Sequence, residues 1–213
     1  MKPHLTSLLL LPQLHHALAY TPLSDTSLRN LIPPQKDVSS SSPNSDPDFD
    51  PLHGTLLAPI LQPRVPGTQG HAAVQSHFAS FIRTHLHPAW RLEWHNTTAT
   101  TPATGARQVP FANLVLRRDP PGAAAGDVAR LTLAAHYDSL YRPEGFVGAV
   151  DSAVPCAVLL FVARAVDAAL TRRWEEGGGG EGLEEEKGVQ ILLLDGEEAW
   201  VQWSEGDSLY GSR

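Results

Sequence analysis

The stretch that decides the fold is residues 189–198, Val-Gln-Ile-Leu-Leu-Leu-Asp-Gly-Glu-Glu, in which a short apolar run passes directly into an acidic turn. An apolar run of this length, bounded by turn-forming residues, is typical of a buried β-strand. Residues 131–139, Leu-Thr-Leu-Ala-Ala-His-Tyr-Asp-Ser, repeat the arrangement and predict a second buried strand. Between them, residues 153–174 are mostly Ala, Val, Leu and Phe, which predicts a largely buried helix. Strand, helix and strand in this order predict a parallel βαβ unit.

The residues before this unit predict one more helix and two more strands. Apolar residues recur at helical spacing at Val74, Phe78, Phe81, Ile82 and Leu86. They predict an amphipathic helix over about 70–87 that ends before Pro88. Apolar and polar residues then alternate over 90–95, and a second apolar stretch over 111–116 follows a turn region rich in Thr, Pro and Gly, so we expect two antiparallel strands. The chain is predicted to be an α/β protein.

Composition limits the class of protein. The 213 residues are 42% hydrophobic and 18% charged, which suffices for one packed domain and excludes a wholly disordered, collagen-like or multi-pass membrane protein. The net charge is −7, from 16 Lys+Arg and 23 Asp+Glu, and no basic cluster stands out, so nucleic-acid binding is not expected. Cys156 is the single cysteine, so no internal disulfide can form. We expect a globular monomer.

The N-terminal residues predict a secretory signal. Lys2 precedes a leucine run over 8–11, and Ala17-Leu18-Ala19 has the small-x-small form of a signal-peptidase site, so residues 1–19 are predicted to be a signal peptide. The alternative interpretation of these residues is a frayed N-terminal tail. The apolar segment is too short and too interrupted to span a membrane. Residues 20–54, with a Ser/Pro-rich linker, are predicted to be disordered or loosely packed. Asn96-Thr97-Thr98 is an N-glycosylation acceptor, so we expect a protein of the secretory pathway or the extracellular space.

Residues that can bind a metal gather at the predicted strand ends. They are His136, Asp138, Asp151, Glu197 and Glu198, and zinc accepts imidazole and carboxylate ligands. Each has a structural alternative: a strand cap or core hydrogen bond for His136, a helix N-cap for Asp151, and a solvated turn for the glutamates. Because buried carboxylates need a cation or a donor network, the set predicts a metal site. Neighbouring side chains on an extended segment point in different directions, so one glutamate can bind metal while the other acts as a general base.

Three blocks of sequence carry a specific resemblance. Residues 135–139 read Ala-His-Tyr-Asp-Ser, residues 148–156 read Gly-Ala-Val-Asp-Ser-Ala-Val-Pro-Cys, and residues 195–213 begin Asp-Gly-Glu-Glu-Ala. They closely resemble the zinc-dependent glutaminyl-peptide cyclotransferases (glutaminyl cyclases) of the zinc aminopeptidase-like clan, peptidase family M28. The resemblance implies a three-layer α-β-α sandwich with a mixed, mainly parallel sheet. Residues 55–213 would form the N-terminal part of that catalytic domain, incomplete at the C-terminus.

The resemblance also implies roles for individual residues. Asp151 and Glu198 match zinc ligands, Glu197 matches the general acid/base, and Trp203 matches an aromatic residue of the substrate pocket, with a core aromatic as the alternative. The implied reaction cyclises an N-terminal Gln (or Glu) of a peptide or protein to pyroglutamate, with release of ammonia from Gln. His136 is a ligand in the two-zinc aminopeptidases of the clan, whereas the cyclases keep the motif with a single zinc. His136 and Asp138 are therefore either part of a second metal site or structural.

The resemblance further implies groups that match nothing in this chain. One Zn²⁺ ion is expected, but its third ligand, a histidine, and an aspartate that assists catalysis fall outside these residues. Three interpretations stay open. The chain is a cyclotransferase that is active only when completed, a secreted zinc-dependent peptide hydrolase in which His136 and Asp151 form a second metal site, or a non-catalytic remnant.

Overall fold

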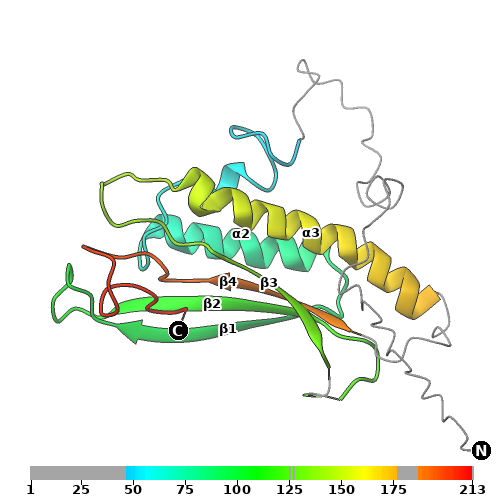
Figure 1. Cartoon of the computed structure of the whole chain (residues 1–213). Coiled ribbons are helices and arrows are strands. Elements are labelled where there is room, and N and C mark those ends of the chain that lie inside the picture. Colours follow the sequence, from blue (N-terminus) through cyan, green and yellow to red (C-terminus); the bar gives the residue numbers. More distant parts are fainter. Residues whose placement is uncertain (1–46, 125, 127, 177–186, 213) are drawn as a thin grey trace, which may run out of the picture. The chain divides into compact units, whose positions relative to one another are not determined.

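The structure, a computed structural model, describes residues 47–124, 126, 128–176 and 187–212. The predicted signal peptide over 1–19 and most of the segment predicted over 20–54 lie outside these residues. The described part forms an α/β fold in which two helices pack on a four-stranded mixed sheet (Figure 1).

The sheet consists of β1 (Arg91–Ala99), β2 (Val109–Arg118), β4 (Gly188–Leu194) and β3 (Arg130–His136), in that spatial order. β1 pairs antiparallel with β2, and β3 pairs parallel with β4, which confirms both predicted strand pairs. β2 also pairs antiparallel with β4. One of the three pairings in the described residues is therefore parallel. The sheet is mixed, as predicted, but it is not mainly parallel in these residues. β2, the inner strand of the hairpin, lies between β1 and β4 and runs antiparallel to both.

Both long helices cover the same face of the sheet (Figure 1). α2 (Gln69–His85) begins at Thr68, whose side chain accepts the backbone N–H of His71, and it ends shortly before Pro88, as predicted. α3 (Val154–Thr171) carries Pro155 in its first turn, where the missing N–H costs no hydrogen bond. Three short helical turns complete the elements: η1 (Ala58–Ile60), η2 (Ala149–Ala153) and η3 (Arg172–Glu176).

The hydrophobic core lies between these helices and the sheet. Its main members are Val74, Phe78 and Ile82 from α2, Cys156, Ala157, Leu160 and Ala163 from α3, and Leu114, Leu116, Ile191 and Leu193 from the strands. The strand members are alternate residues, as the two-residue period of a strand requires. Burying each leucine-sized side chain contributes roughly 1.5–3 kcal/mol to folding. The core therefore fixes which residues at the strand ends face the site.

β3 differs from the prediction of a buried strand. Leu131 is 63% exposed, and the strand forms an edge of the sheet in the described residues. The apolar run over 131–135 indicated burial on both faces, but here the helices cover one face of the strand.

The helical stretch Ala149–Trp174 is long and apolar enough to cross a membrane, judged by length and composition. Its inner face packs in the core described above. A helix that packs against a sheet has the same apolar character, so the stretch is weak evidence for a membrane span.

The parallel pairing places the candidate site. His136 at the end of β3 is the register partner of Leu194 at the end of β4, and the N–H of Tyr137 donates to the carbonyl of Leu194 at 2.8 Å. The polar segments that follow the two strands therefore begin side by side, as the sequence predicted.

Candidate metal centre

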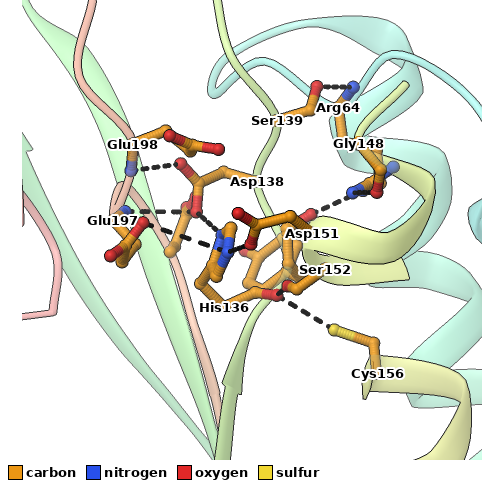
Figure 2. A network of polar contacts seen from close by, with 12 residues as sticks. Arg64, His136, Asp138, Ser139, Gly148, Asp151, Ser152, Cys156, Glu197 and Glu198 are labelled. Carbon is orange, nitrogen blue, oxygen red and sulfur yellow. Dashed lines mark hydrogen bonds and ion pairs between the residues drawn. The ribbon is translucent and has the colours of Figure 1, made fainter. Parts of the chain in front are cut away.

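Three side chains that can bind a metal converge beyond the ends of β3 and β4. His136, Glu197 and Glu198 each offer a ligand atom, and these atoms all lie within 4.8 Å of one another. No other such group of three occurs among the residues that the structure describes. Figure 2 shows the glutamates on one side of the imidazole. One imidazole and two carboxylates form a donor set that suits zinc.

The buried carboxylate of Asp138 contacts all three of these residues. Its Oδ1 accepts the backbone N–H of Glu197 at 3.1 Å, and its Oδ2 accepts that of Glu198 at 3.0 Å (Figure 2). Nδ1 of His136 lies 3.3 Å from the same Oδ1. The carboxylate is buried, and both of its oxygens are occupied by these contacts. The geometry favours the structural alternative for Asp138, since a carboxylate that orients a histidine and its neighbours is typical around metal ligands.

Asp151 approaches the imidazole from another side. Its Oδ1 lies 2.8 Å from Nε2 of His136, and its side chain is 79% exposed on η2 (Figure 2). Nε2 of His136 is also 3.9 Å from Oε2 of Glu197. The structure therefore brings Asp151 and both glutamates to His136, but Asp151 is not a member of the group whose ligand atoms all lie within 4.8 Å.

Burial, together with the nearness of several carboxylates to one another, shifts the pKa values of the cluster. Burial raises the pKa of Glu198 to about 7; His136 opposes the rise, whereas Asp138, Glu197 and Asp151 add to it. Burial also raises the pKa of Glu197. Burial alone would lower the pKa of His136, but its contacts with Asp138 and Asp151 and the charge of Glu197 outweigh that effect and raise it to about 9. A cation at this place would relieve the same repulsion.

The carbonyl group of His136 anchors the end of β3 to the start of α3. Both Oγ of Ser152 and Sγ of Cys156 donate to it, the latter at 3.1 Å (Figure 2). Burial raises the pKa of Cys156 to about 12, although Arg64 opposes the shift. The thiol therefore stays protonated at neutral pH and serves as a structural donor rather than as a nucleophile.

Arg64 is a residue of the site that the sequence analysis missed. It is fully buried, and its guanidinium donates to the carbonyls of Tyr137 at 2.7 Å, Ile60 at 3.0 Å and Gly148 at 3.2 Å. Its own backbone N–H donates to Oγ of Ser139 at 2.8 Å. Arg64 thus ties down both ends of the segment that joins β3 to η2. No sequence signal marks it, because most arginines are exposed.

The two remaining predicted residues, Trp203 and Asn96, are both exposed. Trp203 is 54% exposed and does not belong to the core, so its ring is accessible to a ligand. It follows a turn in which the carboxylate of Asp207 accepts the backbone N–H groups of residues 200–202. Asn96 lies on β1 opposite Ala112.

Comparisons with known proteins show that the chain is similar to members of one protein family. Residues 113–213 match the sequence profile of peptidase family M28. The chain is 41% identical over 165 residues to a glutaminyl-peptide cyclotransferase-like protein of Mus musculus, a match that covers 76% of this chain. It is 39% identical over 161 residues, 74% of this chain, to a glutaminyl-peptide cyclotransferase of Bos taurus.

Solved structures give the same result. A glutaminyl cyclase from Macrostomum lignano superposes with a TM-score of 0.63 and 28% identity, over 92% of this chain and 49% of that one. A Zn-dependent exopeptidase from Parabacteroides distasonis shares the fold, with a TM-score of 0.52 and 20% identity over 74% of this chain and 51% of that one. The chain spans about 40% of the length of the two curated relatives, namely 39% and 41%.

Proposed function

Because the chain belongs to the glutaminyl cyclase family within peptidase family M28, we propose that it carries the N-terminal part of a zinc-dependent glutaminyl-peptide cyclotransferase. The observation that carries the proposal is the convergence of His136, Glu197 and Glu198 at the ends of two parallel strands, inside the region that matches the family. The substrate would be a peptide or protein with an N-terminal Gln or Glu. We also propose that the complete protein is a three-layer α-β-α sandwich, in which further helices cover the second face of the sheet.

The residues proposed to hold one zinc ion are Asp151 and Glu198, with a histidine ligand that matches no residue of this chain. The carboxylates and imidazole gathered at His136 fit such an ion chemically. When bound, zinc supplies a Lewis acid that polarises the γ-carbonyl of an N-terminal glutamine. Asp138 keeps the backbone of both glutamates in place for this task.

Glu197 is the proposed general acid/base. The α-amino nitrogen of the substrate forms a bond to its own γ-carbonyl carbon, and the bond from that carbon to the amide nitrogen breaks. Glu197 takes the proton that the amine loses and delivers it to the departing nitrogen, which leaves as ammonia. Because burial raises the pKa of Glu197, it holds and releases a proton closer to neutral pH than an exposed glutamate. The exposed ring of Trp203 is proposed to contact the substrate.

Secretion is part of the proposal. A signal peptide over 1–19 would direct the chain to the secretory pathway, where the exposed Asn96 would receive a glycan. Expression in a secreting eukaryotic cell tests both points. We expect an N-terminus after Ala19 and a mass shift on deglycosylation that Asn96→Gln removes. A full-length, unglycosylated intracellular product would contradict them.

One observation favours a second function, a zinc-dependent peptide hydrolase. Nε2 of His136 lies 2.8 Å from Oδ1 of Asp151, so an imidazole and a carboxylate stand where a second metal ion could be held between them. In that reaction Glu197 would take a proton from water rather than from an amine.

One assay separates the two functions. The zinc-supplemented chain is incubated with a peptide that begins with Gln, and the products are followed by mass spectrometry and by an ammonia assay. Ammonia and a pyroglutamyl peptide support the cyclotransferase, whereas free amino acid without ammonia supports the hydrolase. Glu197→Gln should abolish either activity while zinc stays bound. The absence of stoichiometric zinc from this chain, with zinc restored in a longer chain that supplies the histidine ligand, would support the non-catalytic remnant. A metal-loaded and active chain of these 213 residues would rule it out.

A further inference from the structure

His71 on α2 forms a buried pair with Asp195, the first residue after β4. Nε2 of His71 lies 2.9 Å from Oδ1 of Asp195, and the two residues are 4% and 0% exposed. They are separated by 124 positions in the sequence. Neither residue has a role in the chemistry proposed above, so the presence of a buried ionisable pair here needs another explanation.

Asp195 is bound on every side. Its Oδ2 accepts the backbone N–H of Ala112 at 2.7 Å, and its own N–H donates to Oδ1 of Asn113 at 2.8 Å. Since a carboxylate can only accept, Nε2 of His71 is the donor in the contact with Oδ1. Burial raises the pKa of Asp195, and the contact with His71 opposes that rise. Removing this donor would leave a buried carboxylate oxygen without its imidazole partner.

His71 touches the residue that follows each of the two parallel strands. Its ring stacks on Tyr137, just beyond β3, with ring centroids 5.1 Å apart and 18° between the planes. It binds Asp195, just beyond β4. His71 on α2 therefore contacts the first residue of both segments, the one that follows β3 and the one that follows β4.

A single tightly packed residue, Gly196, separates Asp195 from the glutamates. Gly196 has a φ of +65°, and a Cβ atom there would lie 2.4 Å from the ring of Phe111. The carbonyl of Gly196 accepts the N–H of Tyr210 at 2.7 Å, and the carbonyl of Glu197 accepts that of Leu209 at 3.1 Å. A shift of Asp195 would therefore be passed on to Glu197 and Glu198.

We propose that His71 is a positioning residue, which holds Asp195 and through it keeps the proposed zinc ligand Glu198 and the proposed general acid/base Glu197 in place at the metal centre. The functional half of this inference rests on the proposed metal centre. The structural half concerns the order of the Glu197–Glu198 turn and stands without a metal.

Three variants of the full chain test the inference. His71→Leu replaces the imidazole donor with an apolar side chain of similar bulk, and His71→Gln keeps an N–H donor. Val74→Ala is the matched control, since Val74 is fully buried on the same helix and faces the core. Amide hydrogen exchange of the metal-free chain is measured at Glu197 and Glu198, whose N–H groups bind Asp138. Zinc affinity is measured by chelator competition, and the visible spectrum of the Co²⁺-loaded chain reports ligand geometry.

His71→Leu should speed exchange at both amides about tenfold or more, because the turn opens locally. It should weaken zinc binding about tenfold and shift the Co²⁺ spectrum, as the loss of a residue that supports metal ligands does. His71→Gln should stay within about threefold of the parent in exchange and zinc affinity, and Val74→Ala should do so despite a lower melting temperature.

Unchanged exchange at both amides in His71→Leu would overturn the inference, and so would an equal effect of Val74→Ala. The exchange measurement also separates this inference from the proposed function. If the parent chain binds no zinc while His71→Leu still speeds exchange, these residues alone do not hold the metal, and the positioning role stands.

Discussion

The carboxylate of Asp138 accepts the backbone N–H of Glu198 at 3.0 Å, across 60 positions of sequence. Its other oxygen accepts the N–H of Glu197 at 3.1 Å. Asp138 follows β3 and the glutamates follow β4, so this contact joins the two strand ends that form the site. Hydrogen bonds within the protein therefore hold the glutamates near His136, without the help of a metal ion.

Asp138→Asn should weaken zinc binding at least about tenfold, because an asparagine can offer only one oxygen to the two N–H groups. The amide that replaces the second oxygen would face a donor. One of these two partly buried N–H groups would then be unpaired, which costs about 1 kcal/mol of unfolding free energy. Chelator competition gives the affinity and urea unfolding gives the stability.

Asp167→Asn is the matched control for that change. Asp167 is also a buried carboxylate that accepts two donors, the N–H of His87 at 2.9 Å and Nε1 of Trp90 at 2.8 Å, but it lies on α3 away from the cluster. It should lose comparable stability and keep its zinc affinity. If both variants lost affinity equally, Asp138 would have no specific role at the site.

Much of the fold follows from local patterns in the sequence. The amphipathic period of α2, the apolar run of β4 and the acidic turn that follows it are all visible within short windows, and the strand–helix–strand order predicts that His136 and Glu197 meet. The antiparallel pairing of β2 with β4 could not be predicted in this way. It joins residues about 80 positions apart, such as Leu114 and Leu193, and no local pattern encodes that register.

The supporting residues of the site were equally hidden. Nothing in the sequence marks Arg64 or His71 as buried, since arginine is mostly exposed and histidine is intermediate between buried and exposed residues. Their partners are backbone carbonyls or side chains from distant segments. Only the position of Asp195, at the end of an apolar strand, hinted that its carboxylate would need a buried donor.

The metal-free chain should become more stable as the pH falls from about 9 to about 6.5. The pKa of His136 is raised to about 9 in the folded chain, so the folded state binds a proton that the unfolded state takes up only near pH 6.5. The stabilisation from His136 is therefore complete below that value and lost as the pH rises through about 9. Glu198, with a pKa raised to about 7, adds stability in the same direction as the pH falls below 7. With a chelator present, we expect a melting temperature roughly 5 °C higher at pH 6.5 than at pH 9.

His136→Gln is the comparison for the pH series, because it keeps a polar side chain that does not titrate. Its melting temperature should vary less between pH 9 and pH 7 than that of the parent. Adding zinc to the parent should oppose the trend, since metal ligands must be deprotonated to bind. A metal-free parent that is most stable at pH 9 would contradict the charge balance described for the cluster.

Gly196→Ala should destabilise the chain more than the same change at another left-handed glycine. The φ of Gly196 is +65°, and the added Cβ would meet the Phe111 ring at 2.4 Å and 2.6 Å. Gly145 also has a positive φ, +82°, but its Cβ would meet no atom within 4 Å. Gly145→Ala should therefore cost about 1–2 kcal/mol from backbone strain alone. Gly196→Ala adds a clash in a packed site and should cost about 2–5 kcal/mol in all. Urea unfolding measures both, and equal losses would show that the turn can move away from Phe111.

Arg64→Lys should be strongly destabilising although it preserves the charge. The guanidinium donates in several directions at once, to the carbonyls of Tyr137, Ile60 and Gly148, and a lysine ammonium on a single stem cannot reach all three. Each buried carbonyl left without a donor costs about 1–3 kcal/mol, so we expect a loss of about 3 kcal/mol in urea unfolding. Arg117→Lys is the control, because Arg117 pairs with Glu93 at 3.1 Å on the partly exposed surface, and it should lose less than about 1 kcal/mol. If Arg64→Lys were as mild as Arg117→Lys, the segment between β3 and η2 would hold its shape without the arginine, and the placement of Asp151 beside His136 would need another cause.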